Sequence, residues 1–415
     1  MKKNILFVSI AFPPKSDPEA LQTAKYFHYL QKHKELLIDV VTSDIPTLYM
    51  PYDQDLEAYT KGINQLISIS LKENRYVNFA LNRLGLQGMV FPDVKQSFHK
   101  QFDKVIKQLK NKPDLIYSRA YPNSSTIMAY KLKQLLKVPW VLHMSDPWVD
   151  CPVKRMSGSF YKKNDEWEKK CFEAADIISL TSIPTIDFYK KKYPNLTGKF
   201  RFYPNVYELT NDEEHENTKN KKDDKIFRVV YTGGMADART PEFFLKPLSE
   251  LYKNNPDISN ELEVIIAGEA DSRNRAILHN YNLPFVKFLG KVPFKEALQL
   301  QRSADYLIAI DFIVKEPEKA MFFLSKLLDY MVARKRILTL TIKGSASDQV
   351  MQDLKGDVCD HNDTEAIKEA FIKALDAFAK KDHNYLVNTF VPQKYEASYN
   401  TDRLYHDMME LMNIK

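Results

Sequence analysis

Short apolar runs alternate with longer amphipathic stretches along most of the chain. In the first half each run is brief and bounded by polar or turn-forming residues, which is typical of parallel strands buried on both faces. Five runs are predicted as strands, at residues 5–10, 38–42, 115–118, 140–143 and 177–180. Helical spacing separates them, at residues 20–32, 98–110, 130–136 and 166–175. This alternation predicts an α/β domain with right-handed crossovers.

The same rhythm restarts after a charged break at residues 208–225, which we interpret as a linker or long surface loop. Strands are predicted beyond it at residues 228–231, 262–267, 286–289, 306–310 and 336–341. Helices are predicted at residues 241–252, 294–302, 324–332, 364–379 and 396–412. Residues 44–95 lack clean periodicity, and we interpret them as an insertion with some helix. The chain is therefore predicted to hold two doubly wound, Rossmann-like domains, whose shared cleft is the default ligand site.

Composition narrows the class of protein. The chain has 415 residues, of which 44% are hydrophobic and 27% charged, close to the globular average. Its three cysteines, Cys151, Cys171 and Cys359, are far apart and lack metal-site spacing, so we expect a reducing, cytoplasmic compartment. The net charge of +6 is too small to indicate nucleic acid. No apolar run is long enough for a membrane-spanning helix.

The N-terminus allows two interpretations. Lys2 and Lys3 precede a short apolar run, as in a signal peptide, but no small-residue cleavage site follows convincingly. A buried first strand is the favoured interpretation.

Two loops of the first half follow predicted strands and carry candidate chemistry. Ser16 and Asp17 precede a helix, where they either help to bind an anion or sugar hydroxyl or cap the helix. Ser145 and Asp146 follow the strand at 140–143, and Asp146 is either a general base or hydrogen-bond acceptor for a sugar, or a turn cap. His143 belongs to the strand itself, and a satisfied core histidine is its favoured interpretation.

Two loops of the second half point to a phosphate group. Gly233 and Gly234 allow close backbone approach to a ligand, and Arg239 is placed to form a fork of hydrogen bonds to a diphosphate. A surface arginine after a tight turn is the alternative. Lys326 falls in the first turn of a helix, where its charge adds to that of the helix N-terminus. Asp329, one turn on, either binds the two hydroxyls of a ribose or forms a surface pair with Lys326.

Lysine is frequent from Lys95 to Lys137. Between these two lie Lys100, Lys104, Lys107, Lys110, Lys112, Lys131 and Lys133. On helix faces these side chains either lean on anionic lipid headgroups or form a solvated basic face.

The order of these motifs resembles the glycosyltransferases of GT-B fold, specifically the retaining family 4 type that builds bacterial surface polysaccharides. The resemblance covers nearly the whole chain. The segments that carry it are Phe12-Pro13-Pro14, Phe91-Pro92-Asp93, Val138-Pro139-Trp140, Asp146-Pro147-Trp148, Tyr203-Pro204-Asn205, Phe288-Leu289-Gly290 and Ser325-Lys326-Leu327-Leu328-Asp329-Tyr330-Met331. It implies an acceptor domain at residues 1–205, a linker at 206–225 and a donor-binding domain at 226–395. The terminal helix, 396–415, is expected to return to the first domain.

The resemblance also implies roles for individual residues. Arg239 takes the place of a basic residue that contacts the donor diphosphate in the family. Gly234 stands where the family has a second basic residue, so that contact is expected to be lost. Asp329 matches the second glutamate of the Glu-x7-Glu motif, and the first falls at Met321, a departure from the family. The remaining donor-side candidates are Gly290, Lys291 and Val292 beside the nucleobase, Glu318 or Glu316 as a substitute for the missing glutamate, and Phe323, Leu324 and Ser325 at the start of the helix.

The expected reaction transfers a sugar from a UDP- or GDP-type nucleotide sugar to a hydroxyl of a saccharide or lipid-linked acceptor, with retention at the anomeric carbon. Arg239 and Lys326 neutralise the leaving diphosphate, so no metal or other cofactor is expected. Peripheral contact with the inner face of an anionic membrane is part of this prediction. An epimerase of GT-B fold acting on the nucleotide sugar, or a non-catalytic nucleotide-sugar-binding protein, are the alternatives.

Overall fold

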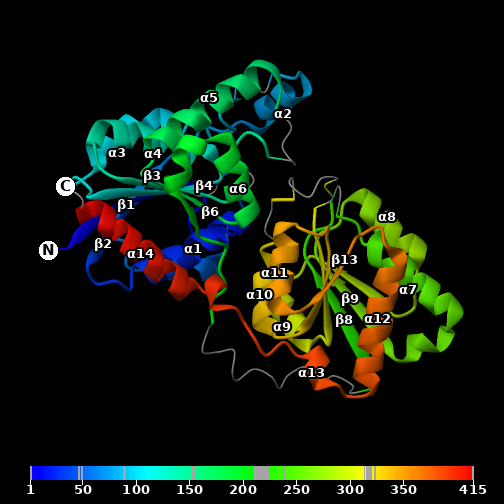
Figure 1. Cartoon of the computed structure of the whole chain (residues 1–415). Coiled ribbons are helices and arrows are strands. Elements are labelled where there is room, and N and C mark those ends of the chain that lie inside the picture. Colours follow the sequence, from blue (N-terminus) through cyan, green and yellow to red (C-terminus); the bar gives the residue numbers. More distant parts are fainter. Residues whose placement is uncertain are drawn as a thin grey trace. The chain divides into compact units, whose positions relative to one another are not determined.

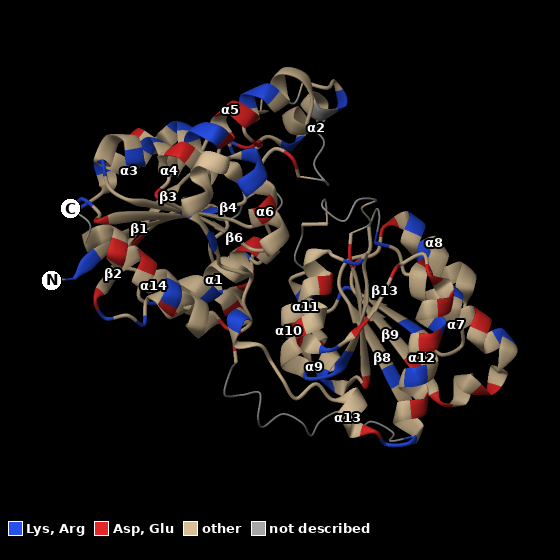
Figure 2. Ribbon diagram, viewed as in Figure 1, with Lys and Arg blue, Asp and Glu red and all other residues tan. Residues whose placement is uncertain are grey.

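The protein is described by a computed structural model that covers residues 2–44, 47, 50–86, 90–151, 156–209, 225–236, 239–312, 314, 320–321 and 324–413. The chain divides into two compact units. Unit 1 comprises Met1–Glu208 and Lys394–Lys415, and unit 2 comprises Leu209–Gln393. Most of the charged segment at 208–225 lies outside the described residues. Lys, Arg, Asp and Glu are interspersed on the helices of both units (Figure 2).

Unit 1 is built, within the described ranges, on a seven-stranded parallel sheet of order β3-β2-β1-β4-β5-β6-β7. Its strands are β1 (Lys3–Val8), β2 (Leu36–Ser43), β3 (Gln65–Ile69), β4 (Leu115–Ala120), β5 (Trp140–Met144), β6 (Ile177–Leu180) and β7 (Phe200–Phe202). Its α-helices are α1 (Pro18–Leu30), α2 (Arg75–Arg83), α3 (Phe102–Gln108), α4 (Asn123–Leu136), α5 (Gly158–Ala174), α6 (Ile183–Lys192) and α14 (Ala397–Asn413).

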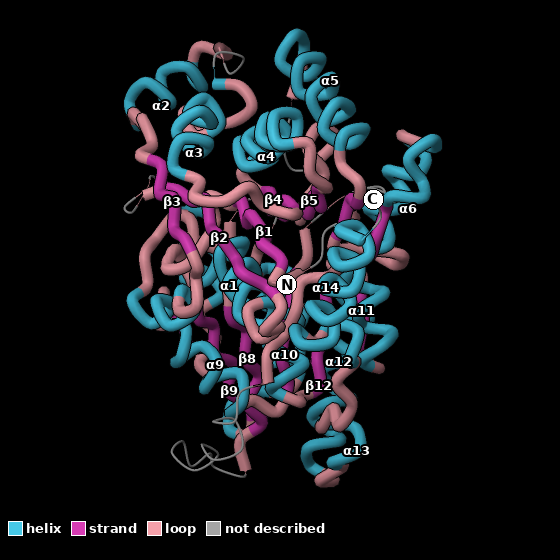
Figure 3. The backbone as a smooth tube through the Cα atoms, turned by 90° about the vertical axis from the view of Figure 1, so that its left-hand side faces the viewer, coloured by secondary structure: helices cyan, strands magenta, loops and turns pink. Residues whose placement is uncertain are grey.

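Both faces of this sheet are covered by helices. Helices α1 and α14 lie on one face, and α3, α4 and α5 lie on the other (Figures 1 and 3). Each face has its own apolar core. Phe7 and Val40 pack with Phe27 and Leu404 on the first face, and a second cluster that includes Leu142 fills the other. Burial on both faces explains why these strands are continuous apolar runs rather than alternating ones.

Unit 2 repeats the architecture with six described parallel strands in the order β10-β9-β8-β11-β12-β13. Its strands are β8 (Phe227–Thr232), β9 (Leu262–Ala267), β10 (Val286–Gly290), β11 (Tyr306–Ile310), β12 (Arg336–Leu340) and β13 (Asp357–Cys359). Its α-helices are α7 (Glu242–Asn254), α8 (Ser272–Tyr281), α9 (Phe294–Ser303), α10 (Lys326–Ala333), α11 (Ala346–Leu354), α12 (Thr364–Ala379) and α13 (His383–Leu386).

The α/β class predicted from the sequence is confirmed, and every predicted strand is present. The helix expected within residues 44–95 is present as α2, but these residues also include the edge strand β3, which is not predicted. Its alternate side chains, Leu66 and Ser68, face solvent, so it lacks the continuous apolar run that marks the inner strands. Strands β7 and β13 have only three residues each and were missed, as were helices α6, α8 and α11.

The strand orders indicate where ligand sites are expected. In each sheet the first strand lies between the second strand and a strand that follows a crossover to its other side, namely β1 between β2 and β4, and β8 between β9 and β11. Doubly wound sheets bind ligands at the carboxyl ends of the strands on either side of such a switch point. No helix in the described part of the chain combines the length and the apolar character needed to cross a bilayer.

Candidate functional site: two basic side chains at the end of β8 in unit 2 and a buried ion pair in unit 1

The loop after β8 is packed against the loop after β9 through two glycines. Gly233 donates its N–H to Ala267 O at 2.8 Å, and Gly268 donates to Gly290 O at 2.7 Å. A Cβ on Gly268 would lie 2.0 Å from Gly233 O, and both glycines have positive φ, +152° and +136° respectively. Only glycine allows this approach, which holds the carboxyl ends of β8, β9 and β10 together.

Lys326, the first residue of α10, places its ammonium group at the end of β8. Its Nζ donates to the Tyr231 hydroxyl at 3.1 Å and lies 4.2 Å from the centroid of the Tyr231 ring. The Tyr231 hydroxyl in turn donates to Gly234 O at 3.1 Å. Burial lowers the pKa of Lys326 well below its usual range, and the charge of Arg239 lowers it further.

Arg239 approaches the same place from the loop after β8. Its guanidinium lies 3.9 Å from the centroid of the Phe312 ring, and its carbonyl accepts from Asn274 Nδ2 at 3.3 Å. Burial lowers the pKa of Arg239. Its Nε is buried and has no hydrogen-bond partner among the described residues. A buried guanidinium donor left open in this way suits a ligand acceptor atom.

The only carboxylate that both cations sense electrostatically is Asp311, at the end of β11, among the groups whose interactions the described residues define. Asp311 accepts from Thr341 Oγ1 at 2.9 Å, and burial raises its pKa. Burial weakens the one counter-charge that both side chains sense, and a bound anion would favour the charged form of Lys326. The ends of β8 and β11 therefore form a candidate anion site at the switch point of the second sheet.

Tyr330 holds the two strands of this switch point in register. Its hydroxyl donates to Ile308 O on β11 at 3.0 Å and accepts from the N–H of Thr232 on β8 at 3.0 Å. The side chain is fully buried. Because Tyr330 lies one turn after Lys326 on α10, it fixes the helix that carries the ammonium group.

The other predicted donor-side residues are more dispersed. Gly290 ends β10, and Lys291 forms an exposed ion pair with Glu269 at 3.2 Å. Val292 and Asp329 are half-buried.

Ser325 is the N-cap of α10 but makes no side-chain cap bond, and the carbonyl of Leu324 accepts the N–H of Leu327 at 3.0 Å. Glu316, Glu318 and Phe323 lie outside the described residues.

Met321 occupies the position of the family's first motif glutamate, and it is only 2% exposed. The preceding Ala320 carbonyl accepts from Ala346 N at 3.0 Å, which fixes the segment to α11. An ionised carboxylate in such a place would carry a large desolvation cost. The apolar side chain is therefore built into the fold of unit 2 at this position.

In unit 1 the loop before α1 supplies a cap. Asp17 Oδ1 accepts from the N–H groups of Glu19 at 3.1 Å and Ala20 at 3.2 Å. Asp17 Oδ2 is buried without a partner in the described ranges, and burial raises the pKa of this carboxyl. Ser16 is held by its N–H, which donates to Pro51 O at 2.8 Å. Asp17 therefore caps α1, one of its two predicted roles, and keeps one oxygen open.

Sequence reasoning missed a buried ion pair next to this loop. Glu19, in the first turn of α1, accepts from Arg119 Nε at 2.9 Å and from the Ser145 hydroxyl. The side chains of Glu19 and Arg119 are 10% and 0% exposed. Burial raises the pKa of Glu19 to about 7, although Arg119 and Ser145 oppose the shift. A signal was available, since Arg119 directly follows the apolar strand run predicted at 115–118.

The remaining residues of this edge differ in their surroundings. His143 is fully buried on β5, where its Nδ1 lies 2.8 Å from Ser179 Oγ, so it is a core histidine. Asp146 is half-buried, and its charge, together with those of Asp93 and Asp17, raises the pKa of Tyr121. Burial is the larger cause of that shift. Ser16, Asp17, Ser145 and Asp146 thus all belong to the carboxyl edge of the first sheet.

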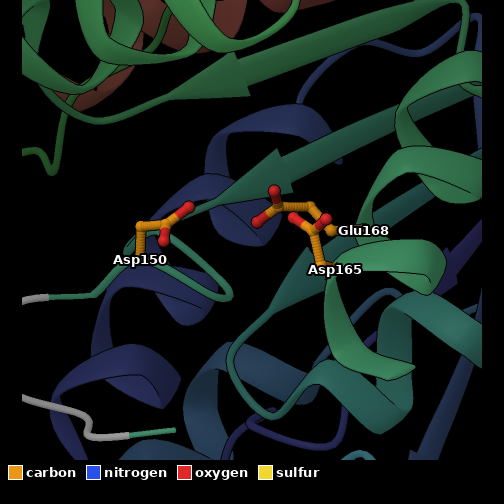
Figure 4. A group of neighbouring side chains, drawn as sticks. All are labelled: Asp150, Asp165 and Glu168. Carbon is orange, nitrogen blue, oxygen red and sulfur yellow. The ribbon is translucent and has the colours of Figure 1, made fainter. Parts of the chain in front are cut away.

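Three carboxylates on the other side of the loop after β5 resemble a metal site. Asp165 and Glu168 on α5 turn their carboxylates towards Asp150 (Figure 4). The Lys192 ammonium, however, lies 2.7 Å from Asp150, 2.8 Å from Asp165 and 2.7 Å from Glu168. It provides the positive charge that a metal would bring, so this cluster is a structural salt bridge that ties the loop to α5 and α6.

Comparison with known proteins identifies the fold. No protein-family profile and no curated protein sequence matches the chain. Among solved structures, HepE of Anabaena in complex with UDP and glucose is similar over 98% of this chain and 100% of its own, with a TM-score of 0.61 and 11% identity. The chain has the GT-B fold.

Other GT-B structures are similar to the same extent. The UDP-forming α,α-trehalose-phosphate synthase of Burkholderia xenovorans, solved with glucose 6-phosphate, matches 99% of this chain and 100% of its own at a TM-score of 0.64 and 11% identity. A Listeria monocytogenes protein assigned as a UDP-N-acetylglucosamine 2-epimerase is similar over 99% of this chain and 96% of its own, with a TM-score of 0.60 and 12% identity. Glycosyl transfer and epimerisation both occur on this GT-B fold, so the fold alone does not choose between them.

Proposed function

We propose that the protein is a glycosyltransferase that moves a sugar from a nucleotide-diphosphate sugar to an acceptor hydroxyl. The observation that carries the proposal is the pair of desolvated cations, Lys326 and Arg239, at the β8–β11 switch point. GT-B structures similar to this chain hold UDP and glucose, as in HepE, or glucose 6-phosphate, as in the trehalose-phosphate synthase. A diphosphate is the anion that such a pair would neutralise.

The chemistry breaks the bond between the anomeric carbon and the diphosphate oxygen and forms one from that carbon to the acceptor oxygen. Negative charge grows on the departing diphosphate, which takes the bonding electron pair. Fixed cations at that position lower the barrier because they need no reorganisation when the charge develops. The acceptor hydroxyl loses its proton to the leaving diphosphate oxygen or to a carboxylate of unit 1.

The finer assignments extend this proposal. The enzyme retains the anomeric configuration, accepts a UDP or GDP donor and needs no metal, since Arg239 and Lys326 supply the positive charge. It acts in the cytoplasm on a saccharide or lipid-linked saccharide, in polysaccharide or glycolipid synthesis, as the family 4 resemblance implies. Gly290, Lys291 and Val292 would border the base, Asp329 the ribose, and Ser16, Asp17, Ser145 and Asp146 the acceptor.

The test begins with donor binding to the wild-type chain. A panel of nucleotide-diphosphate sugars is screened by thermal shift, since a specific ligand stabilises according to its excess over Kd. Lys326→Ala and Arg239→Ala should each abolish the shift produced by the best donor, whereas the exposed Lys253→Ala, on the same unit, should keep it. In turnover assays, each of these two substitutions should raise the activation free energy of sugar transfer by roughly 2–4 kcal/mol.

Product analysis then separates the candidate reactions. A transferase releases nucleoside diphosphate at a rate that rises with acceptor concentration. An epimerase instead changes the configuration of the sugar, which stays attached to the nucleotide. Donor binding that survives both substitutions would refute the assignment of Lys326 and Arg239.

A further inference from the structure

Helix α2 (Arg75–Arg83), which follows the edge strand β3 of unit 1, exposes large apolar side chains to solvent. The side chains of Tyr76 and Phe79 are 84% and 64% exposed, and that of Leu84, just beyond the helix, is 69% exposed. The most buried of the described side chains of this helix is polar, since Asn78 is only 9% exposed, while Leu81 is half-buried. Tyr76 and Phe79 lie three residues apart and therefore share one face of the helix.

The helix is well formed despite this exposure. Asn74 caps its start, since its Oδ1 accepts from the N–H groups of Tyr76 and Val77 at 3.0 Å each. Gly85, with φ of +69°, ends it, and the N–H of Leu86 donates back to Leu81 O at 2.8 Å. Nine residues are too few for a stable helix in isolation. Burial of an apolar face normally supplies the remaining stabilisation of so short a helix. Here that face is in solvent.

The charges around the exposed face are basic. Within residues 71–86 the basic side chains are Lys72, Arg75 and Arg83, all exposed. The single acidic residue of that segment, Glu73, is ion-paired with Lys95, and the two side chains are 8% and 3% exposed. A bulky apolar face on a segment whose exposed charges are all basic is complementary to an anionic lipid surface, in which the rings insert below the headgroups.

The position of α2 links this face to the acceptor edge. The Glu73–Lys95 pair joins the start of the helix to the segment that holds Asp93, and Asp93 accepts from the N–H of Ser124 in the first turn of α4 at 2.8 Å. This first turn follows β4, one of the two switch-point strands. Figures 1 and 3 both place α2 at the periphery of unit 1.

We infer that α2 is an interfacial membrane helix, which inserts Tyr76, Phe79 and Leu84 into an anionic bilayer and brings the acceptor edge of unit 1 to a lipid-linked acceptor. The membrane contact stands on the exposed face itself, and only the acceptor class rests on the proposed function. Two of the lysines predicted to serve this purpose, both on α4, are already held by other groups. Lys133 is paired with Asp176, and Lys131 donates to His99 O at 3.2 Å.

Co-sedimentation with vesicles tests the inference on the full chain. Vesicles of phosphatidylcholine alone are compared with vesicles that also contain phosphatidylglycerol. Wild type should bind the anionic vesicles, and Tyr76→Ser/Phe79→Ser/Leu84→Ser should bind at least about tenfold more weakly. Ile372→Ser is the matched control, since Ile372 is 52% exposed on α12 of unit 2, and it should bind like wild type.

Two results would overturn the inference. One is equal binding of the triple variant and wild type. The other is a wild-type chain that ignores anionic vesicles but dimerises, with the triple variant monomeric in analytical ultracentrifugation, because a second copy would then cover the face. Donor binding, measured by thermal shift without vesicles, should be the same in wild type and the triple variant. It therefore reports on the proposed function separately, and it also shows that the variant is folded.

Discussion

A Cβ at position 233 would lie 2.4 Å from the Nζ of Lys326. Gly233 lies in the loop after β8 and Lys326 is the first residue of α10, so the ammonium group occupies the space that a side chain at position 233 would need. The glycine at the end of β8 thus serves two contacts, one with the backbone of Gly268 and one with the proposed diphosphate-binding cation.

Gly233→Ala should displace the Lys326 ammonium. The added methyl group overlaps Nζ, and φ of +136° is unfavourable for alanine, so we expect donor affinity to fall by about tenfold or more. Isothermal titration with the best nucleotide sugar measures this. Gly198→Ala is the control, since a Cβ added there would have no neighbouring atom within 4 Å, and it should bind normally. Unchanged affinity in Gly233→Ala would separate Lys326 from the donor.

Donor binding should take up protons. Burial and the nearby Arg239 charge hold the pKa of Lys326 well below its usual range, and a bound dianion would raise it again. Binding heats measured in buffers of different ionisation enthalpy report the proton count. Affinity should weaken as pH rises and Lys326 loses its charge. In Lys326→Arg the uptake should shrink, because a guanidinium stays protonated throughout; equal uptake by both proteins would contradict this.

Glu19 should make stability fall as pH rises. Its pKa is about 7 in the folded protein against 4.5 for the ordinary carboxyl, so between these values the folded chain holds a proton that the unfolded chain has lost. The free energy of unfolding therefore declines from about pH 4.5 to about pH 7 through this group. Glu19→Gln should remove that component. Urea unfolding of both proteins at the two ends of this window measures it, and parallel pH profiles would count against the shift.

Lys192 should be a structural cation. Lys192→Met leaves the buried Glu168 carboxylate without its ion pair, and breaking a buried pair costs roughly 3–5 kcal/mol in the free energy of unfolding. Lys192→Arg should retain most of that stability, because it keeps the charge. Chelator should not change the wild-type Tm. A chelator-sensitive Tm would instead assign Asp150, Asp165 and Glu168 to a metal.

The architecture could be predicted because strands buried on both faces are marked by continuous apolar runs. Val8, Val40 and Leu142 are examples of fully buried positions within such runs. The edge strand β3 could not be predicted in this way, because Leu66 is 55% exposed and exposed residues interrupt its apolar run. Short strands such as β7 depend on pairing with a neighbour, here Ile178 with Phe200, which no local pattern reveals.

The candidate site was only partly predictable, for a related reason. Arg239 lies in the loop after β8 and Lys326 begins α10, and strand ends and helix starts can both be located in a sequence. Tyr330 and Asp311 act through tertiary contacts across β8, β11 and β12, which spacing does not encode. The Glu19–Arg119 pair joins residues 100 positions apart, so its existence depends on the topology that brings α1 beside β4.

The return of α14 to unit 1 has a consequence for biosynthesis. Leu404 and Met408 complete the apolar layer that contains Phe27, yet the ribosome makes them only after all of unit 2. Unit 2 is a single uninterrupted segment, so it can finish folding first, while the nascent first unit still exposes one apolar layer. Unit 1 therefore completes its apolar layer only after the segment that follows unit 2 has been made.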